Sequence, residues 1–121
     1  MYYNANPVTN TAGDCVIRAI CRATGNRWDK VYNDLCNEGF KQGDWGSNNS
    51  VWHGYLQKMG YKRYIIPNTC PNCYTIADFA ADNPNGTYIL ATGTHVVTVK
   101  NGDWYDTWDS GTKVPLYFYT K

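Results

Sequence analysis

The chain has 121 residues, of which 43% are hydrophobic and 17% charged, and its basic residues exceed its acidic residues by one. A chain of this size can bury a core of its own, which excludes a disordered protein and predicts a single domain over residues 1–121. A net charge of +1 offers no basic face to nucleic acid and no polybasic run to a membrane. No apolar stretch approaches the roughly 20 residues that span a bilayer, and the polar segment 1–10 is unlike a secretory signal. We therefore expect a cytoplasmic protein without nucleic-acid or membrane partners.

The first half of the chain has the period of amphipathic helices. Apolar residues from Val16 to Cys21 recur on one helical face, and Gly25 follows where a left-handed C-cap would end that helix. A second helix is predicted from about Trp28 to Glu38, with Gly39 as its stop, and a third from about Ser50 to Met59.

The second half has the pattern of strands. Thr75 and Asp78 form a capping box that opens a short helix, and Asn101-Gly102 is a strong hairpin signal. The segments rich in β-branched and aromatic residues are 61–66, 87–91, 95–100, 104–108 and 116–120. Helices followed by strands predict an α+β domain in which N-terminal helices pack against a C-terminal antiparallel sheet on one core.

Five cysteines are the unusual feature of the composition. An odd count in a chain expected in the cytoplasm argues against a disulfide framework and leaves at least one thiol for another task. Cys15 stands at the first turn of the first predicted helix, after Gly13 and Asp14, which suit a tight entry into it. Unpaired N–H groups and the positive helix end favour thiolate over thiol, so we expect Cys15 to be a nucleophile.

A histidine and two carboxylates complete a candidate catalytic group. His95 begins a predicted strand, where a side chain at the rim of the sheet can meet a helix end as a general base. A third group should orient the imidazole, and Asp106 and Asp109 are both available. A two-residue turn at Asn101-Gly102 puts Asp106 on the face of His95. A three-residue loop instead sets His95 opposite Asp109, so the residues by themselves leave both carboxylates open.

A cysteine that opens a long helix, then a histidine that opens a strand, then an acid after a hairpin resembles the papain-like cysteine peptidase superfamily. The segments Gly13 to Ile20 and Tyr105 to Gly111 are similar to small papain-like proteins of phages and gut Gram-positive bacteria. The site spacing is similar to that of Josephin-type deubiquitinases and of bacteriocin leader-peptide peptidases. In these compact families the orienting residue follows the hairpin at the place of Asp109, so the resemblance implies Asp109, with Asp106 as second choice. It also implies Asn10 as the side-chain donor of the oxyanion hole.

The resemblance further implies a papain-like fold and a function. It implies a cysteine-dependent peptidase or isopeptidase that needs no cofactor, acts on a protein or peptide substrate, and is encoded by a phage or bacterium to act on a host protein or its modification. The alternative is a catalytically silent papain-like protein that sequesters a host partner. Substrate identity and oligomeric state stay open.

The segment from Cys70 to Cys73 is a C-x-x-C motif, which is half of a zinc site or a redox pair. A tetrahedral zinc site needs two further ligands, and the other free cysteines, Cys21 and Cys36, fall on predicted core faces. Cys70 and Cys73 are therefore weak metal candidates in a zinc-stabilised module. The competing interpretation is a surface loop whose thiols pack locally, and we expect no metal.

Overall fold

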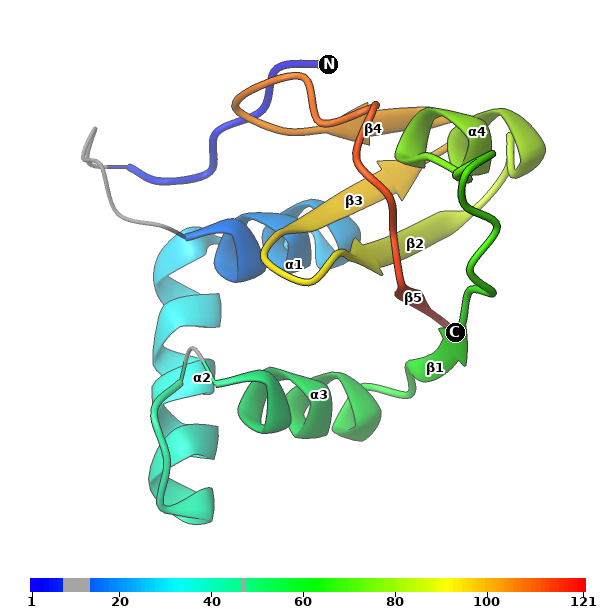
Figure 1. Cartoon of the computed structure of the whole chain (residues 1–121). Helices are drawn as coiled ribbons and strands as arrows, with labels where there is room; N and C mark the ends of the chain where they lie inside the picture. The colour runs from blue at the N-terminus through cyan, green and yellow to red at the C-terminus, as the bar shows by residue number, and fades with distance from the viewer. Residues whose placement is uncertain (8–13, 47) are drawn as a thin grey trace.

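The computed structural model describes residues 1–7, 14–46 and 48–121. Within these ranges the chain forms four helices and five strands, which confirms the α+β class (Figure 1). The strands form one sheet in the order β1-β5-β2-β3-β4, with every neighbouring pair antiparallel. The elements are α1 (Cys15–Thr24), α2 (Trp28–Gln42), α3 (Asn49–Lys58), β1 (Lys62–Ile65), α4 (Ile76–Asp82), β2 (Thr87–Ala91), β3 (Val96–Lys100), β4 (Asp103–Tyr105) and β5 (Tyr117–Thr120).

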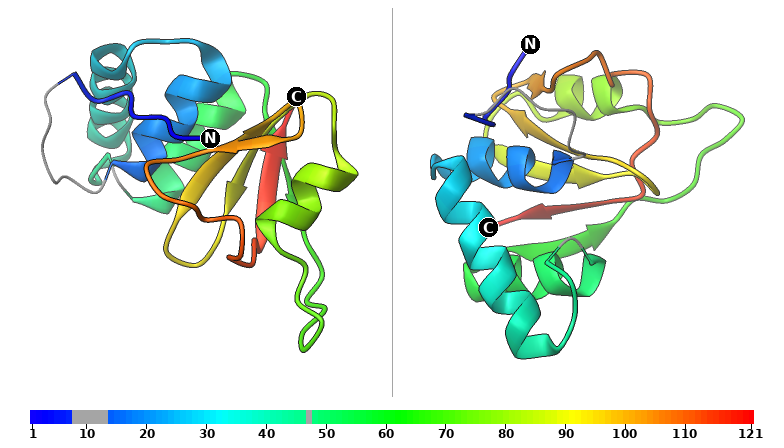
Figure 2. Two further views of the ribbon diagram at one scale, coloured as in Figure 1. Left: turned by 90° about the horizontal axis from the view of Figure 1, so that it is seen from above. Right: turned by 90° about the vertical axis from the view of Figure 1, so that its left-hand side faces the viewer.

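Helices cover both faces of the sheet, so the expectation of a single core is wrong. Ile89 and Ala91 of β2 join a buried cluster with α1, α2 and α3. Leu90, between them, joins a second cluster under α4. Successive side chains of a strand point to opposite faces, so a central strand feeds two cores at once. Figure 2 shows α1 and α4 on opposite sides of the sheet.

Glycines end the first two helices, but not always where the sequence suggests. Gly25 closes α1 in the left-handed conformation at φ 78°, as predicted. The second helix continues through Gly39 and ends at Gly43, with φ 70°. Gly39 has a packing role, because a Cβ there would lie 2.6 Å from the Asp44 carbonyl oxygen. The absence of a side chain lets the chain after α2 fold back onto the helix.

The β3–β4 hairpin has the two-residue turn. Lys100 pairs with Asp103, and the turn residues Asn101 and Gly102 have positive φ of 51° and 84°. Positive φ at both positions is the type I′ geometry that matches the twist of the strands. Strand β4 ends at Tyr105, earlier than predicted.

None of the helices in the described ranges is long and apolar enough to cross a membrane.

Candidate active site

Three separate elements bring the candidate catalytic side chains together. Cys15 is the first residue of α1, His95 directly precedes β3, and Asp106 directly follows β4. Helix α1 packs along β3, and Thr98 Oγ1 donates a 2.5 Å hydrogen bond to the Ala19 carbonyl oxygen. This contact fixes the helix on the strand, so that the N-terminus of α1 and the start of β3 lie at the same end.

His95 lies between the thiol and a carboxylate. Its Nε2 is 2.5 Å from Asp106 Oδ2. The Cys15 sulfur is hydrogen-bonded to the His95 side chain and to the backbone N–H of Val96. Because Nε2 is taken up by Asp106, Nδ1 is the ring nitrogen left for the thiol. The three side chains therefore form a continuous row of Cys15, His95 and Asp106.

The row changes the proton affinities of the thiol and the imidazole in opposite directions. Burial alone would raise the Cys15 pKa, but the hydrogen bonds from His95 and Val96 and the charges of His95 and Arg18 outweigh it and hold the pKa below its ordinary value. Burial alone would lower the His95 pKa, but hydrogen bonds to Asp106 and Cys15 raise it to about 9. The geometry thus favours a thiolate beside an imidazolium.

Asp106 is buried, with 2% of its surface exposed, and both of its oxygens are occupied. Oδ1 accepts from Arg18 Nη2 at 2.8 Å and from the Thr107 N–H at 2.8 Å. Oδ2 accepts from Ser110 Oγ at 2.8 Å and faces His95. Burial acts to raise the Asp106 pKa, but the hydrogen bonds from His95 and Ser110 dominate and hold the pKa below its usual range. Asp106 is therefore a charged acceptor for His95.

Asp109, the first choice from the resemblance, does not contact His95. Its Oδ1 accepts from Trp104 Nε1 and from the Gly111 N–H, both at 3.0 Å. The prediction that Asp109 orients the imidazole is wrong, and Asp106 stands there instead. The reason is the register: continued by one residue, the pairing that starts with Lys100 and Asp103 sets Asp106 opposite Val97, on the same face of the sheet as His95. Beyond Asp106 the chain leaves the sheet and carries Asp109 into a turn of its own.

The remaining predicted residues divide into three cases. Asn10 lies outside the described residues. Cys21 is buried with 2% exposure, as predicted. Cys36 is exposed, so its placement in the core is wrong. The buried face of α2 runs through Val31 and Leu35, and Cys36 is turned about 100° away from Leu35 on the helix.

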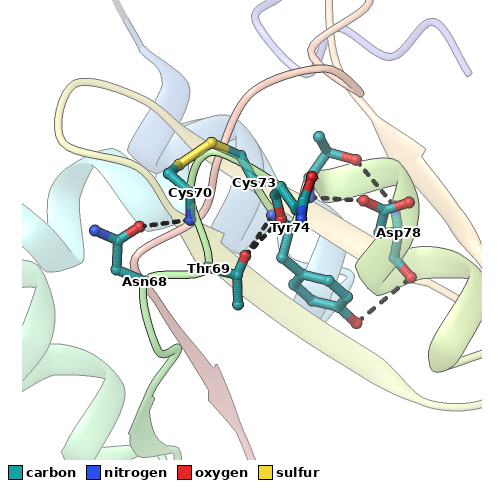
Figure 3. Close-up of a disulfide and its surroundings, with 8 residues drawn as sticks. Asn68, Thr69, Cys70, Cys73, Tyr74 and Asp78 are labelled. Atoms are coloured by element: carbon teal, nitrogen blue, oxygen red, sulfur yellow. Dashed lines mark hydrogen bonds between the residues drawn. A yellow bond between two sulfur atoms is a disulfide. The ribbon is translucent and has the colours of Figure 1, made fainter.

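Cys70 and Cys73 form a disulfide in the loop between β1 and α4 (Figure 3). Asn68 Oδ1 accepts from the Cys70 N–H at 3.0 Å, and Thr69 Oγ1 accepts from the Tyr74 N–H at 2.9 Å. Among the described side chains, no group of three or more His, Cys, Asp or Glu residues could hold a metal ion. Both thiols are therefore used within the loop itself, in a covalent bond rather than in the looser packing that the sequence suggested.

Several residues that contact the site are not identified by the sequence pattern. Arg18 bridges Asp14 and Asp106, and Trp28 Nε1 donates to Asp14 Oδ2 at 2.9 Å. The Trp108 ring lies 4.9 Å from the His95 ring, measured between centroids. Of these contacts, only the Asp14–Arg18 pair has a sequence signal, the i,i+4 spacing of opposite charges on a helix. The others join segments whose proximity depends on the fold.

Two cavities lie near the candidate site. One, of about 330 Å³, has mainly apolar walls that include Val16 and Ile17 of α1, Tyr32 of α2 and Trp45. Asp14 and Val16, which flank Cys15 in the chain, both line this cavity, whereas Cys15 itself does not. The other, also of about 330 Å³, lies beside Asp106 and Trp108.

Comparisons of the chain with protein-family models, with curated proteins and with solved structures each found no match.

Proposed function

We propose that the protein is a cysteine-dependent hydrolase with a papain-like site, a peptidase or isopeptidase in which Cys15 is the nucleophile and His95 the general base and acid. Asp106 orients the imidazole. One observation carries the proposal: His95 is hydrogen-bonded to a thiol on one side and to a buried carboxylate on the other. This is the arrangement of nucleophile, base and orienting group that acyl transfer through a covalent intermediate needs.

The reaction follows from the row. The Cys15 thiolate attacks the carbonyl carbon of an amide, a C–S bond forms, and an electron pair moves onto the carbonyl oxygen. The His95 imidazolium then gives its proton to the leaving nitrogen as the C–N bond breaks, which leaves a thioester on Cys15. Water attacks the thioester with His95 as base, and departure of the sulfur restores the thiolate.

The N-terminus of α1 suits the negative charge that develops on oxygen. The Asp14 side chain does not cap the helix, because Arg18 and Trp28 occupy its two oxygens. The N–H of Cys15 thus belongs to the positive end of a helix whose N-cap side chain makes no capping hydrogen bond. This N–H is one oxyanion donor in the proposal, and Asn10 is the second on sequence grounds.

The apolar cavity beside Val16 fits a protein or peptide substrate, because it suits an apolar side chain. The second cavity is lined by Asp106 and by Trp108, whose ring lies next to that of His95. A phage- or bacterium-encoded enzyme that acts on a host protein or its modification is the setting that the sequence resemblance favours.

The test is selective alkylation of the intact protein. Iodoacetamide labelling from pH 5 to 9, resolved by peptide mass spectrometry, should show Cys15 reacting at a lower pH than the exposed Cys36, and Cys15→Ser should remove that signal. Probes with a ubiquitin-like Gly-Gly tail and peptide aldehydes then separate isopeptidase from peptidase activity. If Cys15 labels only at the pH of an ordinary thiol, the enzyme proposal fails and the silent binding protein is favoured.

A further inference from the structure

Arg18 is a buried cation that joins two carboxylates from different parts of the chain. It lies on α1, one turn after Cys15, with 6% of its surface exposed. Its Nη1 is 3.0 Å from Asp14 Oδ1, and its Nη2 is 2.8 Å from Asp106 Oδ1. A guanidinium has its donors in one rigid plane, so a single side chain can hold two carboxylates at a fixed spacing.

We infer that Arg18 is a positioning residue of the candidate site. Its side chain holds α1, which carries Cys15, at a fixed place relative to Asp106, the carboxylate that orients His95. The inference rests on the proposed function and extends it to a residue outside the Cys15-His95-Asp106 row.

The two oxygens of Asp106 contact different partners. Oδ1 faces Arg18 and Oδ2 faces His95. A carboxylate is planar, so a hydrogen bond that fixes the direction of one oxygen also fixes the direction of the other. Arg18 therefore aims Oδ2 at the imidazole. Because Arg18 and Cys15 share one turn of α1, any displacement of this contact also displaces the sulfur.

Charge supports the same role. The charged groups alternate in sign from Asp14 through Arg18, Asp106 and His95 to the Cys15 sulfur. At the Asp14 end, Trp28 Nε1 of α2 donates a hydrogen bond to the carboxylate. Buried charges persist only where each has a partner of opposite sign. Without Arg18, Asp106 would keep His95 as its cationic partner, but Asp14 would keep only the neutral donor Trp28 Nε1 among the side-chain contacts described above.

Among the described residues, three groups act on the Cys15 thiol: the His95 side chain and the Val96 N–H at the start of β3, and Arg18 on α1. Arg18 is the permanent cation among them. Its removal therefore disfavours the thiolate, both directly and through the loss of order at His95.

The test compares variants of the full chain. We expect Arg18→Met to move the pH midpoint of Cys15 alkylation upward by about one unit, so that labelling at a pH below the wild-type midpoint becomes about tenfold slower. Arg18→Lys keeps a charge but loses the planar fork, so its midpoint should lie between those of wild type and Arg18→Met. The matched control is Arg22→Met on the same helix, since Arg22 stacks 4.0 Å over the Tyr105 ring instead of joining the row. Its midpoint should equal the wild-type value.

The outcomes separate the inference from the proposed function. If wild-type Cys15 labels as an ordinary thiol, the proposed function fails. If wild-type Cys15 is hyperreactive and folded Arg18→Met has the same midpoint, only the role of Arg18 is overturned. Should Arg18→Met fail to fold, Arg18→Lys decides: labelling at a pH below the wild-type midpoint that is at least threefold slower than wild type supports the inference, and an equal rate there overturns it. A purely structural role would change the melting temperature and leave the midpoint in place.

Discussion

The two cysteines of α1 show how place decides the chemistry of a thiol. Cys15 begins the helix and has its pKa held below the ordinary value by His95 and Val96, against the effect of burial. Cys21, further along the same helix, faces the core, and burial followed by the charges of Asp14 and Asp29 raises its pKa to about 11. Burial acts in the same direction on both sulfurs. The difference is that Cys15 also has donors and a cation beside it, so neither the residue type nor the helix by itself sets the pKa of the thiol.

The largest effect on this difference should come from His95→Gln. The variant removes the cation and the side-chain donor from Cys15 while burial stays, so the Cys15 pKa should rise toward that of Cys21. Labelling of Cys15 by iodoacetamide at pH 7 should fall about tenfold or more. The matched control is His53→Gln, because His53 Nδ1 pairs with the Tyr119 hydroxyl at 2.7 Å, outside the site. Undiminished labelling in His95→Gln would contradict the row.

The next effect should separate the two candidate carboxylates. Asp106→Asn removes a buried charge from between Arg18 and His95, and we expect it to lower the free energy of unfolding by about 3 kcal/mol and to slow Cys15 labelling. Asp109→Asn should leave both near wild type, because the hydrogen bonds of Asp109 come from Trp104 and the Gly111 N–H and not from His95 or Arg18. Urea denaturation and the same labelling assay measure the pair. Equal behaviour of the two variants would remove Asp106 from its role.

The two histidines should titrate in different pH ranges. The His95 pKa, about 9, lies above that of an unfolded histidine, so the stability it contributes is complete below pH 6.5 and is lost as the pH rises to 9. Burial and the nearby Arg63 lower the His53 pKa. Histidine NMR resonances should therefore titrate in two steps, His53 below pH 6.5 and His95 well above it. The urea midpoint should fall between pH 6.5 and 9 in the wild type and stay flatter in His95→Gln. A single step near pH 6.5 would contradict both assignments.

The smallest effect on the rate of Cys15 labelling should come from opening the Cys70–Cys73 disulfide. Cys70 and Cys73 close a ring of only a few residues, so opening it should cost less than the roughly 3 kcal/mol expected for a 15-residue loop. In the double variant Cys70→Ser/Cys73→Ser, Cys15 should label at the wild-type rate. A slower rate would mean that the loop supports the site. Added zinc should leave the melting temperature of the reduced protein unchanged.

Local signals predicted much of the fold. The capping box at Thr75 is present with both of its hydrogen bonds, and Gly25 ends α1. The turn at Asn101-Gly102 fixes the β3–β4 pairing. Such features depend on a few adjacent residues, whose conformational preferences act before any tertiary contact forms. The helix end placed at Gly39 was wrong because its packing partner, Asp44, is not visible in a helical pattern.

The site was predictable in part for the same reason. Local residue patterns were enough to predict that Cys15 opens a helix and that His95 precedes a strand, because such patterns set helix ends and strand starts. That Asp106 rather than Asp109 faces His95 became visible in the folded chain, since one residue of hairpin register reverses the choice. The tertiary structure also decided the place of Arg18, whose partner Asp106 lies 88 residues away in the chain. Buried charges are paired across such distances by the packing of helix on sheet, which no local pattern encodes.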